Sequence, residues 1–267
     1  MSDRQLLADH LPNLRDLGGL PTTGGARLRP GVLLRSSALS ALSPAGAEAL
    51  TGLLGPGACV DLRTDPEVDR DGGPDHLLAR GWTWHRLPVR DRAPGDHGDT
   101  PEDQLRRHLG TLPRYLEATE RVARLLPAAG PVIIGCSLGK DRTGVVVAVL
   151  LRALGVDRPA IVDDFALSNH QLAAGRHHLP ARWREAATVN EAPARVCTAV
   201  LDRLDRFDES DRSDCPGPHP ALRRIADALD AVRSALTTTA RTPDGQEQPC
   251  PPLTPRPRHG QEQRCPH

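Results

Sequence analysis

One of the six cysteines stands in a segment whose residue types suit the chemistry of phosphate groups. The stretch VIIGCSLGKDRTG at residues 132–144 passes from an apolar run, through a turn bounded by glycines, towards a second apolar run. A tight loop that leads into a helix points backbone N–H groups inward, and the positive end of the helix dipole adds to them. The segment therefore predicts a cradle for a phosphate-sized anion, formed by Ser137, Leu138, Gly139, Lys140 and Thr143.

The same segment would make Cys136 a nucleophile. A free thiol is mostly protonated at neutral pH, and nearby positive charge or a helix N-terminus favours the thiolate. Arg142 follows Cys136 with five residues between them, and its planar fork suits two phosphoryl oxygens at once. One short loop would thus hold a nucleophile, donors for an oxyanion and a phosphate clamp.

The residue pattern of this loop disfavours two other interpretations. A Walker A loop has four residues between its glycines and Ser or Thr after its lysine, whereas Gly135 and Gly139 enclose three residues and Asp141 follows Lys140. Binding of a nucleoside triphosphate is therefore disfavoured. The other alternative is a buried structural thiol, which is common for isolated cysteines. The arginine, the glycines and the two apolar flanks in register favour the functional interpretation.

Alternating strands and helices must position this loop. Apolar runs predict strands at residues 32–35, 58–62, 82–89 and 131–134. Ser43 and Pro44 predict a helix start, with the helix running over 45–54, and helical spacing predicts further helices over 102–126 with a break near Pro113, 145–154, 158–169 and 191–207. We expect a charged turn region over 63–81 and a polar loop over 90–101. The alternation predicts an α/β fold, a central sheet with flanking helices.

The C-terminal part of the chain differs in character. Apolar residues at helical spacing predict a helix over 220–236, after a charged linker. The last residues are rich in proline, lack aromatic residues and repeat the tetrapeptide GQEQ. We therefore expect a catalytic domain over 1–205, a linker and terminal helix over 206–236, and a disordered tail over 237–267.

Composition excludes several classes of function. The 34 basic residues balance the 34 acidic ones, and only three Trp, two Phe and one Tyr are present, so nucleic acid is not an expected partner. The longest apolar run, residues 145–151, is too short to cross a bilayer, and the N-terminus lacks an apolar signal region. We expect a cytoplasmic protein with reduced cysteines and without stable membrane insertion. The scattered histidines form no set of metal ligands.

Five motifs in order resemble those of one family. They are NLRDLGG at 13–19, LRSS at 34–37, VDLRT at 60–64, GKDRTG at 139–144 and DFALSN at 164–169. Together with the Cys-x5-Arg spacing, they resemble the bacterial tyrosine/serine phosphatase branch of the cysteine-based protein tyrosine phosphatase superfamily. The resemblance covers residues 13 to about 170 and implies that family's α/β fold.

The resemblance also implies a reaction without metal or cofactor. The Cys136 thiolate would attack phosphorus in line and form a phosphocysteine, from which water releases phosphate, while Thr143 donates a hydrogen bond to the sulfur. Fixed donors in the loop would meet the charge of the phosphoryl group. The expected substrate is phosphotyrosine in a phosphoprotein, with phosphoserine, phosphothreonine, a phosphorylated small molecule or a phosphoinositide as further candidates.

The leaving oxygen needs a proton, so a carboxyl group must reach the cradle from another element. Asp91 is the first choice, because it ends a predicted strand and opens a polar loop, where the family places its general acid. Asp141, inside the loop, is the alternative and is expected to assist. Asp61 and Asp65 are weaker candidates, and Asp61 is expected to brace Arg63 or Arg35.

One position departs from the family pattern. Gly135 stands directly before Cys136, where most members have histidine. We expect its lack of a side chain to leave room beside Cys136 and to slow the reaction. The second hypothesis for function is therefore a catalytically impaired module that binds phosphate groups without turning them over.

Overall fold

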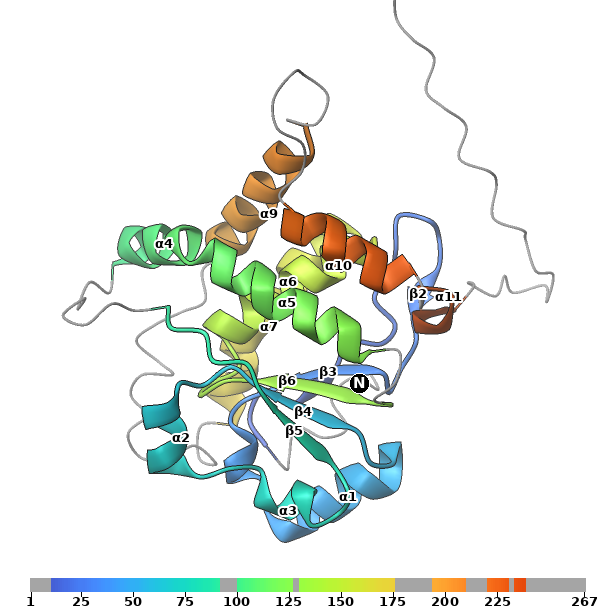
Figure 1. Ribbon diagram of the computed structural model, residues 1–267, viewed down its shortest axis with the longest axis vertical. Helices are drawn as coiled ribbons and strands as arrows, with labels where there is room; N and C mark the ends of the chain where they lie inside the picture. The colour runs from blue at the N-terminus through green and yellow to red at the C-terminus, as the bar shows by residue number, and fades with distance from the viewer. Residues whose placement is uncertain are drawn as a thin grey trace, which may run out of the picture.

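A five-stranded sheet forms the centre of the protein (Figure 1). The computed structural model describes residues 11–91, 100–126, 130–175, 194–209, 220–230 and 233–238. The strand order is β1 (Arg15–Asp16), β3 (Leu33–Ser36), β6 (Val132–Gly135), β4 (Ala58–Asp61) and β5 (Thr83–Arg86). Strand β1 is antiparallel to β3, and the other four strands are parallel to one another. The α/β fold expected from the sequence is confirmed.

Helices cover both faces of this sheet (Figure 1). On one side lie α5 (Leu112–Leu125), α6 (Asp141–Ala153) and α10 (Pro220–Asp230), and on the other side α1 (Pro44–Leu54) and α3 (Asp75–Leu78). Side chains of β6 alternate between the two cores: Val132 and Ile134 belong to the first, and Ile133 belongs to the second. This alternation, with every residue of β6 buried, is the pattern of a central parallel strand.

Local sequence signals set several helix boundaries. At the start of α1, the Ser43 hydroxyl accepts a hydrogen bond from the Gly46 amide at 3.1 Å, and Gly55 ends the helix with a φ of 75°. The break predicted near Pro113 is confirmed, since a single residue, Thr111, separates α4 (Pro101–Gly110) from α5. Further helices are the short 3-10 helix η2 (Leu39–Ala41), α7 (Arg158–Ala174) and α9 (Ala194–Glu209).

The prediction of a turn region over residues 63–81 is wrong. This segment contains α2 (Asp65–Asp71) and α3. Helix α2 begins with the Thr64 amide donating to the Glu67 carboxylate at 2.8 Å, half of a capping box. The two helices escaped the sequence analysis because each is short and rich in charge, so neither displays two turns of apolar spacing.

The core continues past residue 205. Leu222, Ile225 and Leu229 of α10 are buried in the same apolar cluster as α5 and α6. Beyond α11 (Arg233–Leu236), the expected tail begins instead with β7 (Thr237–Thr238), which pairs antiparallel with β2 (Arg27–Leu28). The expected disorder over 239–267 lies outside the described residues.

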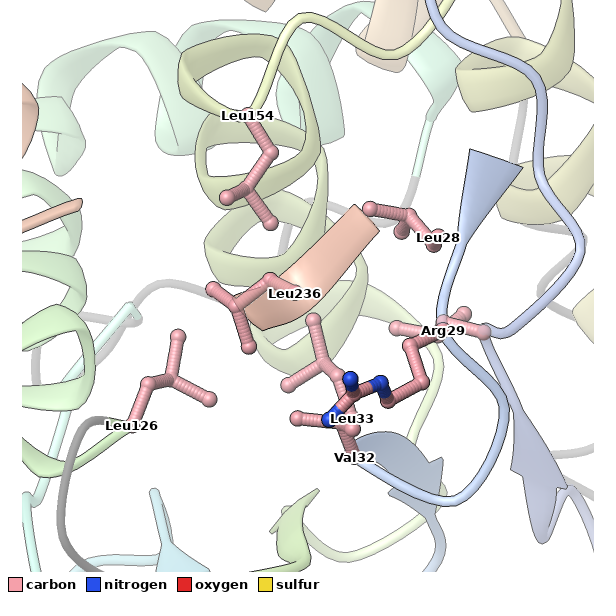
Figure 2. A pocket seen from close by; sticks show the side chains of 8 residues that line it. Leu28, Arg29, Val32, Leu33, Leu126, Leu154 and Leu236 are labelled. Carbon is pink, nitrogen blue, oxygen red and sulfur yellow. The ribbon is translucent and has the colours of Figure 1, made fainter. Parts of the chain in front are cut away.

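A small apolar cavity marks where this C-terminal segment joins the N-terminal part of the chain. Figure 2 shows the side chain of Leu236 between Leu126, Leu154 and Leu33, close to Arg29. The cavity has a volume of about 10 Å³, so it has room for at most one water molecule. The Arg29 amide donates to the carbonyl of Leu236 at 2.8 Å, so α11 is tied to the residue that follows β2.

Parallel strands bring their carboxyl ends to one edge of the sheet, which is where open α/β folds place ligands. Cys136 follows β6 at this edge, the segments that follow β3 and β4 lie on either side of it, and the segment that follows β5 lies next to the one after β4. Within the described ranges, no helix has the length and apolar character needed to cross a membrane.

Candidate active site

Cys136 begins a loop that closes on itself. Its side chain is nearly buried, directly after β6, and α6 starts at Asp141 on the far side of the loop. In the first turn of α6, Arg142 folds back so that its Nη2 lies 3.3 Å from the Ser137 hydroxyl. The Cys-x5-Arg segment therefore forms one compact turn in which the cysteine and arginine share a neighbour, Ser137.

Gly139 permits the loop to approach β3. Its φ of +66° is a conformation that glycine adopts at little cost. A Cβ at this position would lie 2.1 Å from the Ser36 carbonyl oxygen, which is impossible without moving the backbone. The glycine in the middle of the motif is therefore required by contact as well as by conformation.

Two side chains from the N-terminal motifs hold the loop through its carbonyl groups. The Asn13 amide donates to the carbonyls of Leu138 and Gly139 at 2.9 and 2.8 Å. Arg35 donates to the Gly139 carbonyl at 2.7 Å and to the Lys140 carbonyl at 3.3 Å. With these carbonyls bound from behind, the loop curvature that the cradle needs is fixed by partners distant in sequence.

A buried ionic cluster supports these contacts. Asp164 of α7 accepts from Arg15 Nε at 3.0 Å and from Arg35 Nη1 at 2.8 Å, and the side chains of all three residues are almost fully buried. The Ser168 hydroxyl lies 3.1 Å from Nη2 of both arginines. Three of the five sequence motifs, at 13–19, 34–37 and 164–169, therefore contact one another behind the loop, which contains the motif at 139–144.

Glu67 is the site residue that the sequence analysis missed. Its two carboxylate oxygens accept from Arg142 Nη1 and Nη2 at 2.7 and 2.6 Å, and the Ser137 hydroxyl donates to the same carboxylate at 2.7 Å. Burial opposes the charge of Glu67, but hydrogen bonds from Arg142, the positive charge of Arg142 and the bond from Ser137 hold the pKa of Glu67 well below its usual range. The signal available in the sequence was the Thr64-x-x-Glu67 pattern of a capping box.

Both terminal nitrogens of Arg142 thus donate hydrogen bonds to the Glu67 carboxylate. The sequence had led us to expect that both would bind phosphoryl oxygens. The pKa of Arg142 is held above its usual range: burial opposes this, and the hydrogen bond to Glu67 and the charges of Cys136 and Asp91 outweigh it. The charges of the nucleophile and of the first-choice acid therefore both act on this guanidinium.

The four candidate acids have different surroundings. Asp91 is half-buried and follows Arg90, whose carbonyl accepts a hydrogen bond from Arg114 at 3.1 Å. Asp141 begins α6, with its carboxylate 3.7 Å from Lys140 Nζ. Asp61 binds Arg63 at 2.7 Å, as expected, and Asp65 pairs with Arg86 at the surface. The last two carboxylates are engaged by arginines outside the loop.

Two expectations for the neighbours of Cys136 are wrong. The Thr143 hydroxyl is buried and has no hydrogen-bond partner among the described residues, so it does not donate to the sulfur. Gly135 leaves no spare room, because a Cβ there would lie 3.1 Å from the Ser37 carbonyl oxygen and 3.2 Å from the Ser36 hydroxyl. The adjoining cavity, which borders Cys59, has about 10 Å³, far less than an imidazole ring fills.

The other described cysteines differ from Cys136. Burial, assisted by the charge of Asp61, raises the pKa of Cys59 to about 12, and burial also raises the pKa of Cys197 to about 12. Both thiols therefore stay protonated at neutral pH. Over the described ranges, no group of three or more His, Cys, Asp or Glu side chains is arranged to hold a metal ion.

Sequence comparisons with known proteins show the family of this chain. A sequence model of the tyrosine phosphatase family matches residues 6–239. The triple specificity protein phosphatase PtpB of Mycobacterium tuberculosis is 36% identical, over 72% of this chain and 79% of its own length. A Cupriavidus necator protein named as a tyrosine-protein phosphatase is 31% identical over 84% of each chain. Among solved structures, Pseudomonas aeruginosa TpbA is 19% identical, with a TM-score of 0.35 over 67% of this chain and 89% of that one.

The family match spans every element that builds the site, from the segment before Asn13 to β7. PtpB is identical to this chain at more than a third of the aligned positions, and the alignment covers most of both chains. The chain therefore belongs to the tyrosine phosphatase family and is an enzyme of the protein-tyrosine-phosphatase class.

Proposed function

We propose that this enzyme hydrolyses phosphotyrosine in proteins through a phosphocysteine intermediate. Cys136 is the nucleophile and Arg142 binds the phosphoryl group. The backbone N–H groups of residues 137–140, with Lys140 and the N-terminus of α6, surround the phosphoryl oxygens. Asp91 is the general acid, assisted by Asp141. The observation that carries this proposal is the closure of the loop, in which Arg142 of α6 returns to within 3.3 Å of the residue next to Cys136.

The first step forms one bond and breaks another. The Cys136 sulfur bonds to phosphorus, the bond between phosphorus and the leaving oxygen breaks, and that oxygen takes the proton of the Asp91 carboxyl group. In the second step, water attacks the phosphocysteine while the Asp91 carboxylate accepts a proton from that water; the bond between sulfur and phosphorus breaks, phosphate and the free thiolate are released, and the Asp91 acid is restored. Fixed N–H donors suit this chemistry because the phosphoryl group carries negative charge throughout the reaction.

Glu67 has a positioning role in this scheme. Its carboxylate holds both terminal nitrogens of Arg142 and the Ser137 hydroxyl, so the guanidinium is oriented before substrate arrives. Such orientation reduces the entropy lost when the transition state is bound. The name of the M. tuberculosis relative, a triple specificity protein phosphatase, supports more than one class of substrate. Phosphoserine, phosphothreonine and phosphoinositides are the further substrates that we propose.

Replacement of the nucleophile tests the proposal. Cys136→Ser should abolish release of phosphate from a phosphotyrosine peptide and retain binding of the peptide, because serine preserves the loop and does not ionise near neutral pH. Cys197→Ser is the matched control, since Cys197 is equally buried but lies on α9, and it should keep turnover. Turnover that survives in Cys136→Ser would refute the mechanism.

The second hypothesis, a module that binds phosphate groups without turnover, predicts a different result for the wild-type protein. It would bind the phosphotyrosine peptide with no Cys136-dependent release of phosphate. The engagement of both terminal nitrogens of Arg142 by Glu67 is the observation that keeps this hypothesis in view, because substrate must share that guanidinium.

A further inference from the structure

The backbone that leads to Asp91 is fixed on two sides. The amides of Leu87 and Val89 donate to the carbonyls of Asp61 and Leu62 at 2.9 and 3.1 Å, which ties the segment to the end of β4. From the other side, Arg114 in the first turn of α5 donates to the Arg90 carbonyl at 3.1 Å. Asp91 therefore follows directly on a backbone group held by α5.

A histidine and a tyrosine are bonded inside the same helical pair. His108 of α4 and Tyr115 of α5 are joined by a contact of 2.9 Å between the imidazole Nδ1 and the phenol oxygen. Their side chains are almost fully buried, and the two rings lie 5.9 Å apart, centre to centre. A buried polar pair of this kind holds two helices in one relative position.

Tyr115 of this pair packs in the same core as the catalytic loop. Tyr115 packs in the same apolar cluster as Val89 and Cys136, and α5 packs along α6, the helix that carries Arg142. The charges of Asp91 and Asp141 act on both rings. Arg142 and Cys136 also act on Tyr115, and Arg107 and Lys140 act on His108. The two carboxylates expected to handle protons are thus electrostatically coupled to the pair.

A count of protons shows what the pair can offer. Burial lowers the pKa of His108, although Asp141 and Asp91 oppose this, and burial raises the pKa of Tyr115, with Asp91 adding to the rise. At neutral pH both side chains are therefore neutral and hold one exchangeable proton each. Their mutual bond uses one proton, whichever side chain donates. The other proton is available to an acceptor, and Asp91 and Asp141 are the carboxylates whose charge acts on both rings.

We propose that Arg114 and the His108–Tyr115 pair are positioning residues for the Asp91 carboxyl group. Arg114 holds the backbone at Arg90, and the pair presents one hydrogen-bond donor to a carboxyl oxygen of Asp91. With one oxygen so bound, the other carries the proton and is turned towards the leaving oxygen. This inference rests on the proposed function and adds the device by which the acid is aimed.

The test compares substrates that differ only in how much they need an acid. Tyr115→Phe keeps the ring and removes the hydroxyl. Its kcat/KM for phenyl phosphate should fall about tenfold, a fraction of the roughly 10²- to 10⁴-fold that a general acid contributes. Its kcat/KM for 2,4-dinitrophenyl phosphate, whose leaving group needs no proton, should stay within about twofold of wild type. An equal loss on both substrates would overturn the proposal.

Two matched variants on the helix surface provide a second test. Arg114→Ala should show the same selective loss on phenyl phosphate. Arg124→Ala removes an exposed arginine of the same helix, bonded to Glu120 at 2.7 Å, and should leave both substrates unaffected. Because Arg114 is exposed, its variant tests the hold on the Arg90 backbone even if Tyr115→Phe does not fold. Equal behaviour of the two arginine variants would contradict the proposal.

A double variant shows whether Tyr115 acts by positioning the Asp91 carboxyl group or by stabilising the active site in general. In an Asp91→Asn background, Tyr115→Phe should add no further loss on phenyl phosphate, because there is no acid left to aim. Independent losses that multiply would show that Tyr115 acts elsewhere. Failure of the proposed function looks different, since wild-type turnover of either substrate would then not depend on Cys136.

Discussion

Arg142 binds a protein carboxylate and, in the proposed reaction, a phosphoryl group. Both terminal nitrogens contact Glu67, and Nη2 also contacts Ser137. Lysine has a point charge and cannot make these planar contacts together. Arg142→Lys should therefore lower kcat/KM for a phosphotyrosine peptide by about 10²-fold or more. Steady-state kinetics check this, with Arg152→Lys on the same helix as the control expected to resemble wild type. A near-normal Arg142→Lys enzyme would remove Arg142 from its role.

The two candidate acids make separable predictions. Asp91→Asn should slow phenyl phosphate by about 10²- to 10⁴-fold and slow activated aryl phosphates much less, because only poor leaving groups need the proton. Asp141→Asn should have a smaller effect with weaker dependence on the leaving group, as expected for an assisting group at the start of α6. The measurement is kcat/KM across a series of aryl phosphates. A steeper dependence in Asp141→Asn than in Asp91→Asn would exchange their roles.

Sequence reasoning located the loop better than its supports. Cys136 and Arg142 are close in sequence, so their spacing alone places them in one turn. Glu67 contacts Arg142 across 75 positions, and only a local capping pattern marked it. Thr143 was expected to bond the sulfur because of its place beside Arg142, but the direction in which a hydroxyl faces depends on packing that the sequence does not display.

Among the elements, the loop depends on strands and helices that come from both ends of the domain. Asn13, just before β1, binds two loop carbonyls, and its own φ of 62° suits asparagine or glycine. Asn13→Gly keeps that conformation and leaves the Leu138 carbonyl without this donor. It should cost about 1–3 kcal/mol of unfolding free energy. It should also weaken inhibition by vanadate, since the cradle loses its support.

Urea unfolding and vanadate inhibition measure the two effects of Asn13→Gly. The control is Gly24→Ala in the N-terminal turn, where an added Cβ meets only the Thr22 hydroxyl at 4.0 Å. It should change neither quantity by a comparable amount. Unchanged vanadate affinity in Asn13→Gly would show that the loop keeps its shape without Asn13.

Elements with long periodic patterns were predictable, and short ones were not. The strand over 131–134, the helix after it and the break before α5 were confirmed because each has apolar spacing or a proline that acts locally. Strands β1, β2 and β7 have two residues each, too few for any alternation, and exist because distant segments pair with them. Helix α2, which carries Glu67, was missed for the same reason of length.

At the scale of the whole molecule, the C-terminal segment that contains α10 packs into the main core, although its composition differs from that of the preceding chain. The charged segment after residue 205 suggested an appendage, but the apolar face of α10 is buried against α5 and α6. That face was visible in the sequence as helical spacing. The helices against which that face packs could not be predicted, because apolar spacing shows which residues are buried and does not show which element covers them.

The buried His108 links acidity to stability. Burial lowers its pKa in the folded protein, despite Asp141 and Asp91, whereas an unfolded histidine binds a proton near pH 6.5. Below about pH 6.5, the unfolded state therefore binds a proton at His108 that the folded state does not bind. The free energy of unfolding falls as the pH falls through this range, by at most about 1.4 kcal/mol per pH unit. His108→Gln should lose less unfolding free energy than wild type between pH 7 and pH 5. Urea unfolding at both pH values measures this, and an equal loss in both proteins would contradict it.

The central claim is that phosphate passes through Cys136. The most direct measurement is rapid acid quenching of the wild-type enzyme with 4-nitrophenyl phosphate, followed by mass spectrometry of its peptides. The account predicts a phosphoryl group on the peptide that contains Cys136 within the first turnover, together with a burst of nitrophenol equal to the enzyme concentration. Release of phosphate with no phosphorylated cysteine, or with the phosphoryl group on another residue, would contradict it.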